Sequence, residues 1–219
     1  MSVLNLNTHE IDRVYIGDTL ICGAGWKSGD ILKPSAVEEA YEISDKLKEI
    51  WSFTGHTAPI RAVAVDSEGN VYSGGDDSSV RKINKDGEEI WSFTGHTDFV
   101  RAVAIDSEGN VYSGGDDSSI RKINKDGQEV WRFKKETREV NAVAVDSEGN
   151  IYSGSDDSSV RKINKDGQEV WRFTGHTDYV RAVAVDSEGN IYSGSKDNSV
   201  RKINKDGQEI WSFTGHTGS

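Results

Sequence analysis

The feature that most constrains the fold is a repeat, because one sequence pattern recurs every 40 residues. The copies that begin at Trp91 and Trp171 are identical at 31 of 40 positions. Near-identical units of this length are typical of proteins in which structural repeats stack against their neighbours. The repeat is therefore the unit for which a fold must be predicted. Each copy begins at a tryptophan, the last copy being partial: Trp51, Trp91, Trp131, Trp171 and Trp211.

Within one copy, apolar and polar residues alternate with a period of two and are interrupted by turn residues, which predicts a short antiparallel meander. The Asp126-Gly127 pair suits a turn with positive φ. The first strand is apolar on both faces and is expected to be buried, whereas Arg121 and Lys122 predict a more exposed third strand. In the copy that begins at Trp91, the four expected strands are 100–105, 111–114, 120–123 and 129–133.

A single four-stranded meander cannot bury both of its faces, so repeated meanders are expected to pack radially as the blades of a β-propeller. We predict an all-β protein with an N-terminal extension over 1–11 and a five-bladed propeller over 12–219. A closed monomer is preferred over a homodimer, because a free sheet edge must be covered. The blades are expected at approximately 12–54, 55–94, 95–134, 135–174 and 175–219.

The first blade is degenerate, and its sequence supports two interpretations. Shifted by 40 residues, the stretch 20–24 aligns with the apolar first strand of the next copy, which favours a blade with inner strands over 12–46. The alternative is a helix over 36–47, because Ser35 and Glu38 form a capping-box pattern. The blade is the preferred interpretation, because the fourth strand expected after this segment needs three other strands to complete a sheet.

The GHT triplets at 55, 95, 175 and 215 and the stretch SGSKD at 193–197 resemble the WD40 repeat over roughly residues 51–219. Ile123 and its counterparts stand where that family has the tryptophan of its Trp-Asp dipeptide. The tryptophans here lie on the fourth strand, which is closer to propellers of quinoprotein type. The resemblance implies a buried network of histidine, aspartate and serine, formed by His56, His96 and His176 with Asp77, Asp117 and Asp197 and with Ser73, Ser113 and Ser193.

The third copy lacks the histidine of this network, because Lys134, Lys135 and Glu136 replace its TGH triplet. A buried Asp157 or Ser153 that loses its hydrogen-bond partner costs about 1 to 3 kcal/mol. We therefore expect the blade at 135–174 to be looser than the others.

Charge and hydropathy exclude several classes of partner. The formal net charge is -11 and the isoelectric point is near 4.9, so nucleic acids and anionic membranes are not expected as main partners. No apolar run reaches membrane-spanning length and no signal-peptide pattern opens the chain, so we expect a soluble, cytoplasmic protein. The stretch IDRVYIGDTLI at 11–21 resembles short segments near the start of some phage tail proteins, which implies a viral source and a virion-associated alternative.

No candidate catalytic group stands apart from the repeat, so we predict neither an enzyme nor a cofactor or metal site. The histidines have a structural explanation in the network, and no second histidine lies at metal-ligand spacing. The acidic turns DSEGN and NKDGQE lack the alternating spacing of a calcium loop. The tryptophans are interpreted as packing between blades rather than as platforms for sugars.

The copies differ mainly in two loops, which we call the crossover loop, between the fourth strand of one blade and the first strand of the next, and the middle loop, between the second and third strands. Strand alternation places both at one end of every blade. We predict that this end binds a protein or peptide, because aromatic and arginine side chains dominate interface energies. The alternatives are a carbohydrate-binding lectin, and a recently amplified or engineered array with no evolved ligand. The residues of the predicted face are Pro59, Arg61, Asp98, Phe99, Arg101, Arg138, Glu139, Asn141, Asp178, Tyr179, Arg181 and Lys196.

Overall fold

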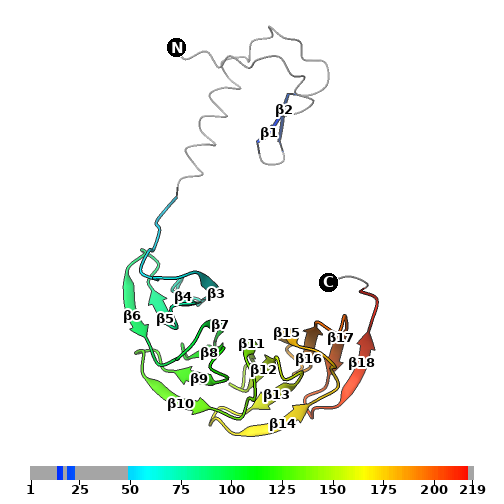
Figure 1. Ribbon diagram of the computed structural model, residues 1–219. Helices are drawn as coiled ribbons and strands as arrows, with labels where there is room; N and C mark the ends of the chain where they lie inside the picture. Colours follow the sequence, from blue (N-terminus) through cyan, green and yellow to red (C-terminus); the bar gives the residue numbers. More distant parts are fainter. Residues whose placement is uncertain (1–13, 17–18, 23–48, 217–219) are drawn as a thin grey trace, which may run out of the picture. The chain divides into compact units, whose positions relative to one another are not determined.

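The computed structural model describes residues 14–16, 19–22 and 49–216. The chain forms two compact units, Met1–Ser52 and Phe53–Ser219, and each is considered by itself. In the first unit, β1 (Val14–Ile16) pairs with β2 (Thr19–Cys22) in a two-stranded antiparallel sheet. The second unit contains four sheets of four strands each (Figure 1).

Each four-stranded sheet is one blade, and its strands follow chain order as an antiparallel meander. Blade 1 contains β3 (Ile60–Val65), β4 (Val71–Gly75), β5 (Val80–Ile83) and β6 (Glu89–Phe93). Blade 2 contains β7 (Val100–Ile105), β8 (Val111–Gly115), β9 (Ile120–Ile123) and β10 (Glu129–Phe133). Blade 3 contains β11 (Val140–Val145), β12 (Ile151–Ser155), β13 (Val160–Ile163) and β14 (Glu169–Phe173). Blade 4 contains β15 (Val180–Val185), β16 (Ile191–Ser195), β17 (Val200–Ile203) and β18 (Glu209–Phe213).

The turns follow directly from the repeated turn residues. In blade 1, Oδ1 of Asp66 accepts the backbone N–H groups of Glu68 at 2.9 Å and Asn70 at 2.8 Å, which closes the DSEGN loop between β3 and β4. Gly69 and Gly87 adopt φ of 84° and 87°, values that favour glycine. Each copy therefore encodes its own hairpins and fixes its own register.

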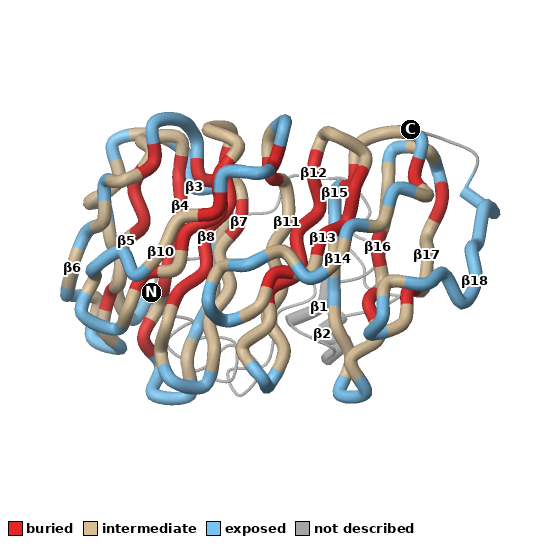
Figure 2. The backbone as a smooth tube through the Cα atoms, turned by 90° about the horizontal axis from the view of Figure 1, so that it is seen from below, coloured by how far each residue is buried: buried red, intermediate tan, exposed pale blue. Residues whose placement is uncertain are grey.

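The blades pack side by side with their first strands innermost, since β3, β7, β11 and β15 lie in sequence as neighbours (Figure 1). The core lies between blades rather than within one sheet, in three clusters that each join two consecutive blades. Burial is greatest along the second and third strands, while β18 is exposed along its whole length (Figure 2).

The prediction of five blades is wrong for the described residues, which contain four four-stranded blades. Residues 49–53, expected as a fourth strand, are not in a strand, and residues 20–22 belong to the β1–β2 hairpin. The sequence of the degenerate segment has Trp26 and Val37 where the next copy has the turn residues Asp66 and Asp77, so it lacks the carboxylates that cap the turns of that copy. The rest of 12–46, including the helix alternative, and the extension 1–11 lie outside the described residues, apart from β1.

The expected exposure of the third strand is also wrong. Arg121 is only 3% exposed, less than most residues of the first strand β7. Its guanidinium is buried as an ion pair with Asp117 at 3.3 Å and with Glu129. An arginine in a strand is thus compatible with burial when carboxylates are placed to receive it.

Candidate functional site

The crossover loop and the middle loop of each blade are joined by a backbone hydrogen bond, so the positions at which the copies differ lie together. In each blade, a backbone N–H of the middle loop donates to a backbone carbonyl of the crossover loop. The bonds run from Asp76 to Pro59 (2.8 Å), from Asp116 to Phe99 (2.9 Å), from Asp156 to Glu139 (3.0 Å) and from Lys196 to Tyr179 (2.9 Å). We use the name variable rim for Pro59, Arg61, Asp98, Phe99, Arg101, Arg138, Glu139, Asn141, Asp178, Tyr179, Arg181 and Lys196.

In blades 1 and 2, an arginine of the rim pairs with an aspartate of the middle loop. Nε and Nη2 of Arg61 donate to the two carboxylate oxygens of Asp76 at 2.7 and 2.5 Å. Arg101 forms the same bidentate pair with Asp116, in which Nη2 donates to Oδ2 at 2.7 Å. The hydrogen bonds from Arg61 lower the pKa of Asp76. These pairs set the orientation of partly exposed guanidinium groups and add little stability.

In blade 3, an asparagine takes the place of the arginine and connects two blades. Nδ2 of Asn141 donates to Asp156 Oδ1 at 2.6 Å and to the carbonyl of Val180 at 3.0 Å. Its Oδ1 accepts a hydrogen bond from Arg181 Nη1 of blade 4 at 2.9 Å. Asn141 is therefore a polar bridge between blades 3 and 4 within the rim.

Blade 4 has a different charge pattern, because Lys196 occupies the position of Asp76. Arg181 therefore has no aspartate at the position that Asp76 has beside Arg61, and it reaches Asp156 of blade 3 at 3.2 Å. The Arg181 guanidinium carbon lies 5.0 Å, and the Lys196 Nζ 5.3 Å, from the centre of the Tyr179 ring. Cations at this distance are attracted by the ring face. The result is a cationic, aromatic patch that the other blades lack.

The remaining rim residues have more limited contacts. Asp98 and Asp178 each accept the backbone N–H of the aromatic residue that follows, at 2.8 Å to Phe99 and 2.7 Å to Tyr179. The Phe99 ring is 38% exposed. The backbone carbonyl of Arg138 accepts a hydrogen bond from Ser155 Oγ at 3.4 Å. The two aspartates therefore hold the crossover loops that carry the aromatic rings.

Beneath the rim, the structure brings each predicted network residue to hydrogen-bond distance of its partners. His56 contacts Asp77 at 2.9 Å through Nδ1 and Ser73 at 2.7 Å through Nε2. The corresponding distances are 3.1 and 2.8 Å for His96, and 2.8 and 2.8 Å for His176. Burial alone raises the pKa of Asp77, but hydrogen bonds from Ser79, Thr57 and His56 lower it well below its usual range. The network fixes the crossover loop on its blade.

The third blade is not left without a partner for this network, contrary to the expectation from its sequence. Glu136 is 5% exposed and occupies the place of the histidine. Its Oε1 accepts a hydrogen bond from Ser153 Oγ at 2.6 Å, and its Oε2 is ion-paired with Arg161. Arg161 also donates from Nη2 to Asp157 Oδ2 at 2.8 Å. A buried glutamate and arginine thus replace one histidine.

Sequence analysis missed two features of the site. It did not pair the rim arginines with Asp76 and Asp116, although each arginine and its aspartate are 15 positions apart in two copies. One member of the pair changes in each of the other copies, the arginine to Asn141 and the aspartate to Lys196. It also missed the role of Arg161. An arginine stands at this position in every copy, and beside Glu136 it forms an ion pair that the other copies lack.

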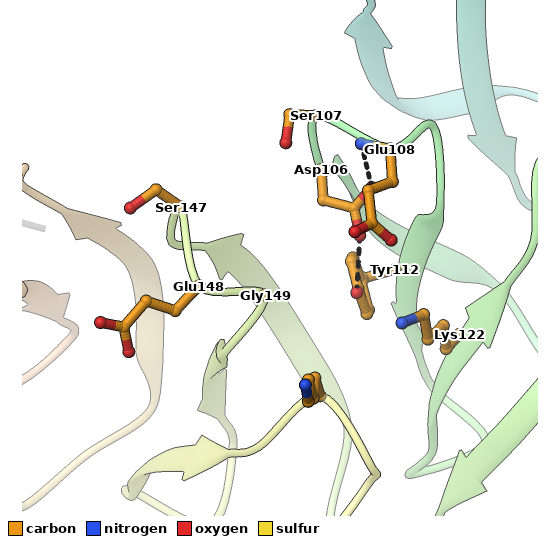
Figure 3. Close-up of a pocket in the computed structure, with 9 residues that line it drawn as sticks. Asp106, Ser107, Glu108, Tyr112, Lys122, Ser147, Glu148 and Gly149 are labelled. Carbon is orange, nitrogen blue, oxygen red and sulfur yellow. Dashed lines mark hydrogen bonds between the residues drawn. The ribbon is translucent and has the colours of Figure 1, made fainter.

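A hollow of about 80 Å³ lies at the opposite end, between the DSEGN loops of blades 2 and 3 (Figure 3). Its lining includes Asp106, Glu108 and Lys122. Asp106 is already occupied, because it accepts hydrogen bonds from Tyr112 Oη and from Asn110 Nδ2, both at 2.9 Å. This hollow is small and its central carboxylate closes the turn, so it is a weaker candidate than the rim.

The described part of the chain contains no group of three or more His, Cys, Asp or Glu side chains that could hold a metal ion. It also contains no helix long and apolar enough to cross a membrane.

Comparison with protein families matches the family described as outer membrane protein assembly factor BamB, over residues 39–153 and 116–219. This is a repeat family that forms β-propellers. The two overlapping matches span more than half of the chain. The comparisons do not confirm the WD40 label and give no support for the phage-tail resemblance of residues 11–21. A search of curated proteins finds no match.

Proposed function

Because the chain belongs to the family described as outer membrane protein assembly factor BamB, we propose that it is a binding scaffold whose variable rim holds a protein or peptide partner. The observation that carries this proposal is the convergence of the differing positions. Crossover and middle loops that vary between copies are hydrogen-bonded to each other in all four blades. The family description names an assembly factor, which favours a protein as the partner.

The chemistry of blade 4 favours a partner that presents a carboxylate beside an apolar side chain. Arg181 and Lys196 lie over the Tyr179 ring, and Lys196 stands where blade 1 has the aspartate that binds Arg61. Phe99, two blades away on the same rim, supplies a partly exposed aromatic surface. An acidic peptide that lies across the rim can place a carboxylate beside Arg181 and Lys196 and an apolar side chain on Phe99. Electrostatic complementarity then favours it over basic peptides.

The test is selection of a random-peptide display library on the immobilised chain, followed by titration of the enriched peptides against variants. We expect acidic peptides to be enriched. Replacing Phe99 and Tyr179 by alanine should weaken their Kd by about 30-fold or more, the scale of interface hot spots. The matched control replaces Ser107 and Ser147, exposed residues of the DSEGN loops, by alanine and should leave Kd unchanged.

A second variant separates charge from packing. Lys196→Asp restores the residue that stands at this position in blades 1 to 3, so Arg181 gains the partner that Arg61 has in Asp76. The fold of blade 4 should be retained and the Kd of an acidic peptide should rise by about tenfold or more. Unchanged Kd values for both rim variants, or an equal loss in the serine control, would show that the rim does not bind the peptide.

A further inference from the structure

The three junctions between neighbouring blades are built from one repeated set of contacts. At the junction of blades 1 and 2, a Cβ on Gly74 of β4 would lie 2.5 Å from Cγ1 of Val100, so the valine packs directly on the glycine. The same approach occurs at the next two junctions, at 2.5 and 2.7 Å. The indole Nε1 of Trp91 also donates to the carbonyl of Lys125 in the following blade at 3.0 Å, and the later tryptophans repeat this bond. Any two consecutive blades therefore use interchangeable surfaces.

Blade 1 has an uncovered surface of the kind that receives a preceding blade. We call this the leading face, defined by Ile60, Val63 and Val65 of β3. These side chains are 46%, 63% and 60% exposed, whereas Val100 and Val140, which correspond to Ile60 in the next two blades, are fully buried. Three exposed aliphatic side chains on one strand form an apolar patch with no cover among the described residues.

Blade 4 has the complementary uncovered surface, which we call the trailing face, defined by Gly194, Trp211 and Phe213. Among the described residues, a Cβ on Gly194 would meet only Ala182 of its own blade, at 3.9 Å, in contrast to the tight valine contacts of the other three glycines. Trp211 and Phe213 are 42% and 53% exposed. The place that a valine of a following blade fills at the internal junctions is open here.

The two free faces match each other position by position. The trailing face carries the same residue types that blade 3 presents to blade 4, with Gly194, Trp211 and Phe213 in the places of Gly154, Trp171 and Phe173. The leading face carries the residues that blade 4 presents to blade 3, with Ile60, Val63 and Val65 in the places of Val180, Val183 and Val185. A trailing face is thus shaped to receive a leading face.

We propose that a second copy of this chain covers these faces, the trailing face of each copy packing on the leading face of the other in a closed head-to-tail pair. A second copy is the expected partner because the three internal junctions already show the equivalent side chains packed against each other. Two chains contribute eight blades, within the range of about four to eight blades that propellers close with. Because the two faces differ, each pair contains the same junction twice.

One stretch of sequence must move for this pair to close. Residues 49–57 and 209–217 are both EIWSFTGHT. His56 binds Asp77 of blade 1, in the way that His96, which follows β6, binds Asp117 of blade 2. At the junction of two copies, both stretches compete for that place. Since they are identical, exchanging one for the other restores equivalent contacts, as in domain swapping.

The experiment measures the mass of the full chain by light scattering after size-exclusion chromatography, with one blocked variant for each face. Gly194→Val fills the open place on the trailing face, where it has room within its own blade. Val63→Lys puts a charge on the leading face, where the native side chain is 63% exposed. Each variant should raise the dissociation constant of the pair by about 100-fold or more, because the closed pair contains the blocked contact twice.

We expect the unmodified chain to have twice the single-chain mass of 24.1 kDa. Each variant alone should have the single-chain mass, and an equimolar mixture of the two should form a pair, because one unblocked junction remains. A single-chain mass for the unmodified protein overturns the proposal, as a segment of the same chain then covers the faces. Masses that grow beyond two chains overturn the closed pair, and pairing by either variant alone overturns the head-to-tail arrangement.

Discussion

Glu136 shows at the residue scale how a buried site tolerates a change of chemistry. The buried side chain accepts a hydrogen bond from Ser153 and is ion-paired with Arg161. Arg161 is also ion-paired with Asp157 at 2.8 Å and with Glu169 at 3.4 Å. Burial raises the pKa of Glu136 to about 7, while the Arg161 guanidinium opposes this rise. One guanidinium is shared among several carboxylates and does not fully offset the effect of burial, so Glu136 takes up a proton more readily in the folded chain than in the unfolded chain.

This pKa predicts a specific pH dependence of stability. The folded-state pKa lies above the value of 4.5 for an unperturbed glutamate, so the stabilisation is fully present below about pH 4.5 and is lost as the pH rises through about 7. Relative to Glu136→Gln, the free energy of unfolding of the native chain should fall by roughly 2 to 4 kcal/mol between pH 4.5 and 7.5. Urea denaturation of both proteins across this range measures the difference. Parallel pH profiles would mean that Glu136 stays ionised in the folded state throughout.

At the scale of elements, each tryptophan belongs to one blade and is held by the next. Nε1 of Trp131 donates to the carbonyl of Lys165 at 2.9 Å, and its ring lies against Gly167 of the following turn. Trp211, the equivalent in blade 4, is 42% exposed. The contribution of a tryptophan therefore depends on whether a blade follows.

We predict that Trp131→Ala costs about 3 kcal/mol, the lower end of the range for a large aromatic residue, because Trp131 is partly buried against the core. Trp211→Ala should cost less than half of this. Both should be measured by urea denaturation in a Gly194→Val background, so that association of copies does not stabilise Trp211. Equal losses of stability at the two positions would contradict the conclusion that no blade in the described part of the same chain covers the trailing face of blade 4.

The elements themselves were largely predictable, because each copy contains its own turn residues. Strand boundaries in the copy at Trp91 agree with β7 to β10 to within one residue, since Asp-Gly and Ser-Glu-Gly-Asn turns fix them locally. The burial of Arg121 was not predictable, because it depends on carboxylates from two other positions, Asp117 and Glu129. The Glu136–Arg161 pair was missed for the same reason.

At the scale of the whole molecule, local patterns do not determine how many blades form. Alignment to the next copy predicts that the degenerate segment is the first of five blades, whereas the described residues contain four four-stranded blades. The rim could be located from sequence because strand alternation fixes which loops share an end. The ion pairs of the rim could not be predicted in full from the sequence, because Arg181 of blade 4 is paired with Asp156 of blade 3 across the junction between two copies.

The most direct test of the binding account is hydrogen–deuterium exchange of the full chain with and without a peptide enriched on it. If the variable rim is the binding face, backbone amides of residues 98–101 and 178–181, where the crossover loops join β7 and β15, should exchange more slowly with the peptide present. Amides of the DSEGN loops 106–110 and 146–150, at the other end of the same blades, should be unchanged. Protection of the DSEGN loops without protection of the crossover loops would contradict the account.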